Sequence, residues 1–170
     1  LLPALGCATS APPVTKIVGG KRIVTRSVSA HAYEHVARAL IYEDEDRWEE
    51  AAAEYQRALS YDGDAPEIHA RLAEAFLALG RTQDAEGEIA RSLSIEPTVP
   101  GLVAKARLEE RLGRPEAAVA ALRQARGLAS FADEPDVAES VHLELADVQL
   151  RSLDPRAAAA TLAALCSAHT

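Results

Sequence analysis

The stretch from Pro66 to Pro97 constrains the fold more than any other part of the sequence. Its apolar residues recur at helical spacing on both sides of Gly80, which indicates two helices joined by a short turn. In the second segment Ala85, Ile89 and Leu93 are four residues apart, so they share one helix face. The two prolines suit the first turn of one helix and the end of the other. The stretch is therefore a helical hairpin, and it needs neighbours because it cannot cover its apolar faces alone.

The same helical pattern continues on both sides of this hairpin. Further helices are predicted over residues 30–42, 48–61, 102–112, 115–128, 137–150 and 156–168. The acids from Glu43 to Asp46 should end the first of them, because they repel one another and face the negative end of the helix dipole. Ser29 is the expected N-cap of that helix, and Asp154 that of the last. Asp64 is expected to cap the helix that begins at Pro66, with Glu67 completing a capping box.

Composition and charge narrow the class of protein. The chain has 170 residues, is rich in alanine and has only 4% aromatic residues, which favours an all-α fold. Residues 1–29 hold four bases and no acid, whereas residues 30–170 hold 14 bases and 26 acids. Nucleic-acid binding needs a basic surface, so the acidic body argues against a nucleic-acid partner. No apolar run approaches the roughly 18 residues that a membrane-spanning helix needs.

Eight helices in four pairs raise the question of an internal repeat. Alanines at the start of each second helix recur at intervals of 34, 33 and 40 residues: Ala51, Ala85, Ala118 and Ala158. The first helices carry a matching set: Ala39, Ala73, Ala106 and Ala146. This pattern resembles the tetratricopeptide repeat (TPR), a unit of 34 residues whose signature has small residues where its helices approach most closely. Large apolar residues occupy a further signature position in the second helices, as Tyr55, Ile89, Leu122 and Leu162.

The resemblance implies an all-α solenoid of four helix-turn-helix repeats, wound into a right-handed superhelix, over residues 30–170. The repeats would cover residues 32–65, 66–98, 99–132 and 139–170. The second repeat fits the signature best. The third and fourth depart from it, because Glu109 and Gln149 stand where the family usually has tyrosine. A helical bundle without repeats is the main alternative.

In the TPR family, ligands usually lie on the concave face that the first helices form. The resemblance places these residues on that face: Tyr33, Val36, Leu40, Glu43, Glu67, Ala70, Glu74, Leu77, Val103, Arg107, Glu110, Leu143, Asp147 and Leu150. Their mixture of apolar, acidic and basic groups suits a peptide or helix with apolar anchors and mixed charge. The alternative is that they only solvate the inner curve. Chaperone-binding TPR proteins clamp a carboxylate with Lys and Asn, which these groove positions lack, so a co-chaperone role is not expected.

Residues 1–7, LLPALGC, resemble the tail of a bacterial lipoprotein signal peptide. The segment from Ala4 to Cys7 would be the lipobox, with Cys7 the lipidated residue. The charged start of such a peptide is missing, so an ordinary apolar terminus is the alternative. Residues 8–29 are predicted to be a flexible linker, in which Gly19-Gly20 could turn a small hairpin. A lipid anchor would place the protein at the outer membrane on its periplasmic side, and the alternative is the cytoplasm.

No catalytic, metal-binding or cofactor motif stands out. His31 and His35 share a helix face, but two ligands do not complete a zinc site. His69 and His142 occupy a helix-packing position of the repeat, and Cys166 is expected to be a packed thiol. No cofactor and no small-molecule substrate are therefore expected.

The last predicted helix, from Ala157 to Cys166, is apolar almost all round. A terminal repeat usually has a polar outer face, so we expect a longer chain or a partner that covers this end. The sequence predicts a non-catalytic interaction scaffold, anchored to the bacterial envelope, that assists the assembly of a protein complex. The alternative is a soluble TPR adaptor, or a regulatory module of a larger protein, such as an enzyme, that continues beyond residue 170.

Overall fold

The computed structural model describes residues 14–18, 21–25, 29–129 and 134–168. These residues form two strands and eight helices: β1 (Val14–Val18), β2 (Lys21–Thr25), α1 (Ala30–Asp44), α2 (Trp48–Tyr61), α3 (Pro66–Ala78), α4 (Thr82–Ile95), α5 (Val99–Arg111), α6 (Pro115–Leu128), α7 (Pro135–Arg151) and α8 (Pro155–Ala168). The strands pair antiparallel, with Val14 opposite Thr25 and Val18 opposite Lys21.

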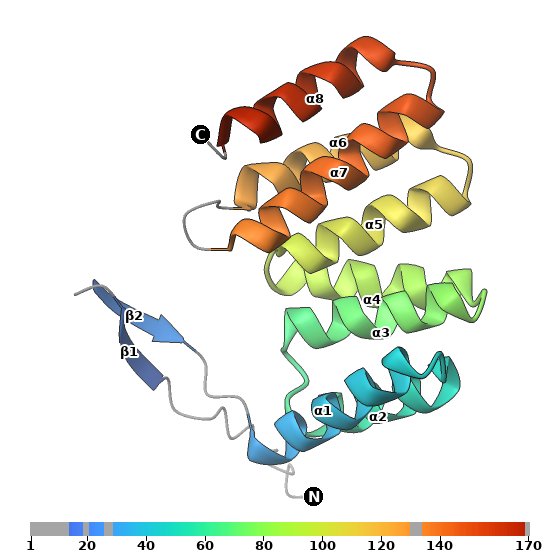
Figure 1. Cartoon of the computed structure of the whole chain (residues 1–170). Coiled ribbons are helices and arrows are strands. Elements are labelled where there is room, and N and C mark those ends of the chain that lie inside the picture. Colours follow the sequence, from blue (N-terminus) through green and yellow to red (C-terminus); the bar gives the residue numbers. More distant parts are fainter. Residues whose placement is uncertain (1–13, 19–20, 26–28, 130–133, 169–170) are drawn as a thin grey trace, which may run out of the picture.

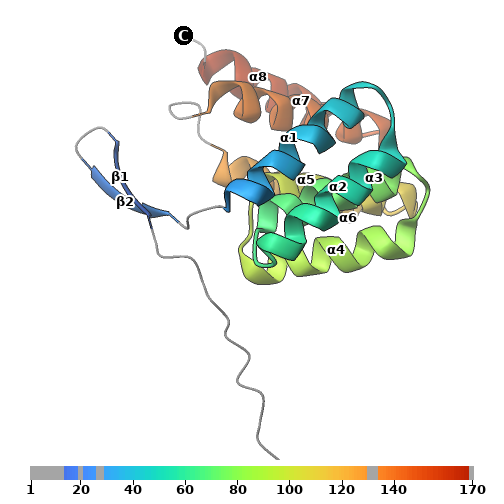
Figure 2. The ribbon, with the colours of Figure 1, turned by 90° about the horizontal axis from the view of Figure 1, so that it is seen from below.

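The helices form four antiparallel pairs that stack in chain order from α1 to α8 (Figure 1). Each second helix packs against the first helix of the following pair, and α3 also packs against α5. The predicted all-α solenoid of four helix-turn-helix repeats is therefore confirmed. The hairpin of β1 and β2 stands apart from this stack in both views (Figures 1 and 2).

The turn inside each pair has the same backbone geometry. The residue at repeat position 15 is left-handed every time: Asp46 (φ 56°), Gly80 (φ 74°), Gly113 (φ 71°) and Leu153 (φ 59°). The next residue then donates its N–H to the carbonyl five residues earlier, as from Arg81 to Phe76 at 2.8 Å. This bond satisfies a carbonyl that the helix end would leave unpaired. The chain therefore repeats one turn four times, although only two of the turns have glycine.

Small residues lie where the helices approach most closely. The signature alanines of the first and second helices are at most 3% exposed in all four repeats. Ser92 occupies a further repeat position that is typical of small residues. Its hydroxyl donates a hydrogen bond to the Pro66 carbonyl at 2.8 Å. The largest apolar cluster joins α1 to α5, while the clusters that reach α6 and α7 are smaller. This difference agrees with the better repeat signature in the first half of the chain.

The helix starts test the predicted caps. Ser29 is the N-cap residue of α1, as predicted, although its side chain makes no capping hydrogen bond. Asp154 accepts a hydrogen bond from the Ala157 amide at 3.1 Å, as predicted for an N-cap. The N-cap of α3 is Ala65 rather than the predicted Asp64. Helix α5 begins before the predicted residue 102, because the Thr98 side chain accepts from the Gly101 amide at 3.3 Å and so caps an earlier start.

Cys166 is exposed, so the expectation of a packed thiol is wrong. Strands β1 and β2 form the small hairpin that was considered within residues 8–29, and the assignment of that segment as a linker stays a prediction. Helix α8 packs chiefly on α7, so Leu162 on its outer side is 37% exposed. Thr161 is buried instead and donates a hydrogen bond to Gln149 at 2.8 Å. The predicted lipobox, including Cys7, lies outside the described residues.

None of the described helices is both long and apolar enough to cross a membrane.

Candidate functional site

A groove runs across the first helices of the repeats and has two adjoining compartments. The first, which we call the charged basin, has a volume of about 550 Å3 and is lined by Glu43, Trp48, Arg71, Glu74, Leu77, Ala78, Arg107, Glu110, Arg111 and Arg151. The second, the apolar slot, has a volume of about 330 Å3, and its apolar lining is Ala70, Val99, Pro100, Val103, Val137 and Val141. Arg71, Glu74 and Arg107 line both, so the compartments form one continuous groove.

An ion-pair bridge lies where the two compartments meet. The Arg107 guanidinium of α5 donates to Glu74 of α3 at 2.8 Å and to Glu144 of α7 at 2.9 Å. Burial raises the pKa of Glu74, and the charge of Arg107 opposes that rise. Burial also disfavours the charge of Arg107, but the two carboxylates outweigh it and raise the pKa of Arg107. Arg107 therefore stays charged, and its contacts with Glu74 and Glu144 connect three neighbouring repeats.

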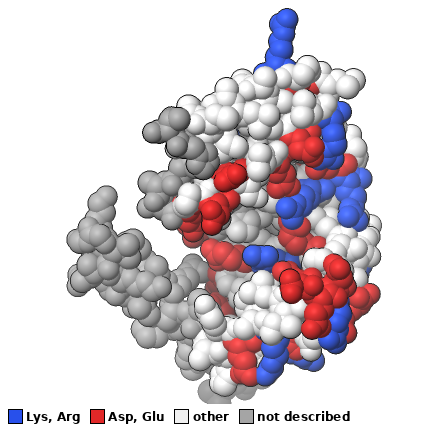
Figure 3. Space-filling model, viewed as in Figure 1, with Lys and Arg blue, Asp and Glu red and all other residues white. Residues whose placement is uncertain are grey.

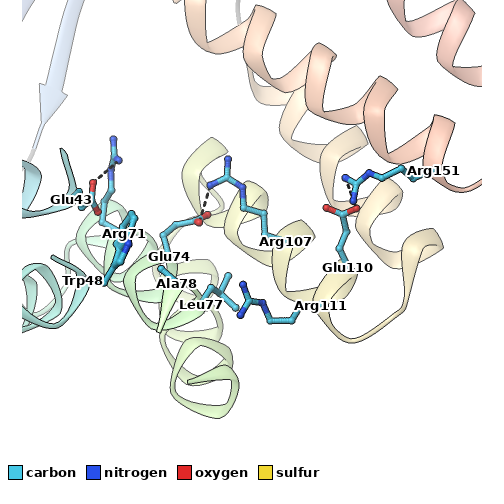
Figure 4. A pocket seen from close by; sticks show the side chains of 10 residues that line it. All are labelled: Glu43, Trp48, Arg71, Glu74, Leu77, Ala78, Arg107, Glu110, Arg111 and Arg151. Carbon is cyan, nitrogen blue, oxygen red and sulfur yellow. Dashed lines mark hydrogen bonds and ion pairs between the residues drawn. The ribbon is translucent and has the colours of Figure 1, made fainter. Parts of the chain in front are cut away.

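Two further ion pairs cross the basin, one on each side of this bridge (Figure 4). Glu43 of α1 pairs with Arg71 of α3 at 3.3 Å, and Glu110 of α5 pairs with Arg151 of α7 at 2.8 Å. Arg151 also pairs with Asp147 on its own helix at 2.8 Å. Exposed pairs contribute only about 0–1 kcal/mol each, so their main effect is to orient the side chains. Figure 3 shows acidic and basic side chains side by side on the face that it draws.

The core contains a buried phenol near Glu43, which lines the basin. Tyr55 of α2 is fully buried, and its hydroxyl has no hydrogen-bond partner among the described residues. Burial raises the pKa of Tyr55, and the nearby charge of Glu43 raises it further. The phenol is therefore a neutral part of the core.

The histidines serve packing between paired helices. His35 contacts Glu54 and His69 contacts Glu88, both at 2.6 Å, and each contact ties a first helix to its second helix. His69 and His142 are buried, as predicted for their helix-packing position. Within the described ranges no three His, Cys, Asp or Glu side chains gather as a metal site would need.

The structure brings half of the predicted site residues into the groove. Those that line it are Glu43, Ala70, Glu74, Leu77, Val103, Arg107 and Glu110. Those that line neither compartment are Tyr33, Val36, Leu40, Glu67, Leu143, Asp147 and Leu150. That any of them contacts a ligand stays a prediction.

Several residues that line the groove were not predicted from the sequence, among them Trp48, Arg71 and Glu144. Arg71 and Glu144 occupy repeat position 6, directly after position 5, which was assigned to the groove. Residues three and four apart share a helix face, so a wider stripe would have included them. Trp48 comes from the start of a second helix, where no groove residue was expected.

Comparison with known proteins identifies the fold. The family profile described as Tetratricopeptide repeat matches residues 43–108. The fold is a TPR solenoid. The matched segment is centred on the second repeat, which has the best signature. None of the curated proteins compared with the chain matches it in sequence.

Solved TPR structures superpose on this solenoid. The TPR2B domain of yeast Sti1, in a complex with pHsp70, has a TM-score of 0.63 at 16% identity, over 72% of this chain and 99% of that domain. The second TPR domain of human RPAP3, in complex with an HSP70 peptide, has a TM-score of 0.57 at 19% identity, over 70% and 95%. The TPR domain of Arabidopsis OM64 has a TM-score of 0.55 at 22% identity, over 68% and 93%. At such identities these similarities establish the fold.

Proposed function

We propose that this TPR solenoid is a non-catalytic scaffold that holds a segment of a partner protein in its groove. The observation that carries the proposal is the groove itself, in which an apolar slot adjoins a charged basin. Most recognition sites combine apolar contact area with a few fixed polar groups. The ion pairs between α3, α5 and α7 hold those groups in place before a partner arrives, which reduces the entropy lost on binding.

The fold supports a peptide or protein ligand. The Sti1 and RPAP3 domains with the same fold are described in complexes with Hsp70 or its peptide. The groove of this chain presents glutamates and arginines in alternation, whereas the sequence lacks the Lys and Asn clamp of chaperone-binding TPR proteins. The partner is therefore a different protein with its own charge pattern.

A bulky side chain in the groove tests this function. Ala78 is exposed at the end of α3 and lines the basin, whereas Ala90 is exposed on α4, which contributes nothing to the groove. Ala78→Trp should prevent a partner from co-purifying with the chain, and Ala90→Trp should leave the partner bound. Circular dichroism and thermal unfolding check that both variants are folded. If the partner co-purifies with Ala78→Trp as well as it does with the unmodified chain, the proposal is wrong.

The second part of the proposal is a lipid anchor at Cys7, which tethers the scaffold to the bacterial envelope for the assembly of a protein complex. Its support is the sequence from Ala4 to Cys7, which resembles a lipobox. The acyl chains on one processed cysteine suffice for stable membrane attachment. We place the protein at the outer membrane on its periplasmic side.

Mass spectrometry of the native protein tests the anchor. The expected result is a polypeptide that begins at Cys7 and carries acyl groups on that residue. The Cys7→Ser variant should no longer be found in the membrane fraction. An unmodified Cys7 that still follows Leu1–Gly6 would contradict it. The groove and the anchor are independent, so either can fail alone.

A soluble adaptor or a module of a longer protein is the second candidate. The exposed outer side of α8, with Leu162 and Cys166, favours it, because a following repeat or domain would cover such a surface. The coding sequence on both sides of this segment distinguishes the candidates. A signal peptide upstream supports the anchored scaffold, and a further domain downstream supports the module.

A further inference from the structure

Arg111 differs from the other arginines of the groove. It is the last residue of α5, and its side chain reaches across the basin toward Leu77 of α3 (Figure 4). Each of the other three arginines pairs with at least one carboxylate, as described above. Arg111 forms no ion pair and no hydrogen bond with any residue that the structure describes. Its position at a helix C-terminus favours the positive charge but leaves its N–H donors free.

The surroundings of Arg111 give a bound carboxylate more than a single contact. Leu77, Ala78 and Trp48 line the same compartment and offer apolar surface beside the guanidinium. A guanidinium can donate two parallel hydrogen bonds to one carboxylate, which makes the pair directional. The rest of the helical body is strongly acidic, so it repels acidic ligands elsewhere. The basin is thus a place in the groove where an acid of the partner meets an unoccupied base.

We propose that Arg111 selects the partner, by receiving an Asp or Glu side chain of the bound segment while an aliphatic side chain of the same segment enters the apolar slot. This inference rests on the proposed binding function of the groove. The slot supplies Val99, Val103, Val137 and Val141 for the aliphatic side chain. The bridge of Glu74, Arg107 and Glu144 lies between the two, so it sets the spacing between the aliphatic residue and the acid. The ligand is therefore a peptide segment that carries both residues at a fixed spacing.

A library of random peptides, displayed on phage through their C-termini, supplies the probe. The display leaves no free C-terminal carboxylate, so acids are read only as side chains. Selection on the immobilised unmodified chain should enrich peptides that combine an aliphatic residue with Asp or Glu at a fixed spacing. Selection on Arg111→Glu should enrich Lys or Arg at that position instead. Arg114→Glu is the matched control, because Arg114 is exposed, pairs with Glu109 and does not line the groove.

A double-mutant cycle with one selected peptide gives the second readout. Changing its acid to the amide should weaken binding to the unmodified chain about twofold to fivefold, the range for an accessible charge pair. The same change should have no effect on binding to Arg111→Ala. Equal losses on both chains would overturn the role of Arg111, even if both chains still bind the peptide.

The remaining outcomes separate this inference from the function on which it rests. Enriched peptides without an acid preference overturn the role of Arg111 and leave the binding groove standing. Enrichment only from a second library, whose peptides end in a free C-terminal carboxylate, has the same meaning. If neither library yields a peptide, or if Ala78→Trp blocks none of the enriched peptides, the proposed function itself fails, and this inference fails with it.

Discussion

Leu153 is the residue that suits its backbone position least. It occupies the left-handed position of the turn between α7 and α8, with φ 59°, where the equivalent residues of the second and third repeats are Gly80 and Gly113. A side chain with a Cβ costs roughly 1–2 kcal/mol in this conformation. Leu153 recovers little through packing, because its side chain is 89% exposed.

We therefore expect Leu153→Gly to stabilise the chain by about 0.5–1 kcal/mol, after the added entropy of the unfolded state is subtracted. Urea unfolding followed by circular dichroism measures this. Ser152→Gly in the same turn is the control and should destabilise, because φ at Ser152 is −81° and its hydroxyl donates to the Val148 carbonyl at 2.7 Å. If Leu153→Gly is no more stable than the unmodified chain, backbone strain at Leu153 does not lower the stability of the last repeat.

Glu54 is a buried carboxylate with two partners. Burial alone would raise its pKa, but the hydrogen bond from His35 and the charge and hydrogen bond of Arg57 outweigh burial and lower it. Because the folded-state pKa lies below the unfolded one, the stabilisation is present above the ordinary pKa of Glu, about 4.3. It is lost as the pH falls through the lower, folded-state value.

The expected result is that Glu54→Gln is less stable than the unmodified chain at about pH 6, and that the difference shrinks toward about pH 3. Glu86→Gln, at an exposed position on α4, should follow the unmodified chain at both pH values. The free energies of unfolding of the three chains at each pH are measured by urea titration. A Glu54→Gln difference that is independent of pH would show that the ionised carboxylate of Glu54 does not stabilise the fold.

At the scale of the elements, the contact between α4 and α5 depends on one glycine. A Cβ at Gly101 would lie 2.7 Å from the Ser92 hydroxyl oxygen, and this hydroxyl is held by its hydrogen bond to Pro66. Gly101→Ala should therefore destabilise the chain by about 1–3 kcal/mol, as overpacking does.

Gly87→Ala is the matched control within α4, because a Cβ there meets nothing within 4 Å. It should stabilise the chain by about 0.5–1 kcal/mol through helix propensity. Thermal unfolding distinguishes the two variants. Equal effects of both would mean that α4 and α5 do not pack as closely as described.

The elements could be predicted well where glycine or proline marks a boundary. Gly80 and Gly113 mark turns, and Pro66 and Pro115 open helices at the predicted residues. Boundaries without such markers could be misplaced by a few residues. Helix α5, for example, begins at Val99 and not at the predicted residue 102, because Thr98 caps it. The strands were only an alternative in the sequence analysis, since a short hairpin has little local signal beyond its turn.

The groove could be predicted only in part, because the resemblance gives the face of each helix but not the partners across it. Arg107 and Glu110 were assigned to the groove, yet their pairing with Glu144 and Arg151 depends on how neighbouring repeats stack. Nothing in the sequence distinguishes the unpaired Arg111 from the paired arginines. That difference appears only once α3, α5 and α7 lie side by side.

The whole molecule combines an acidic helical body with a basic N-terminal segment. The four bases before residue 30 include Lys16, Lys21 and Arg22 in or beside the paired strands, whereas the helices carry the acids. The groove lies on the helices, and the proposed anchor lies at Cys7 before the strands. Attachment and binding are therefore assigned to different parts of the chain.

Binding of a partner in the groove between the first helices can be tested by photo-crosslinking of the full chain in its native cells. A photoreactive amino acid is placed at Ala78 in the basin or at Ala90 on α4. We expect the probe at Ala78 to capture one defined protein, the probe at Ala90 to capture none of it, and Arg111→Glu to reduce the capture at Ala78. If the same protein is captured from Ala90 but not from Ala78, the partner does not bind in the groove.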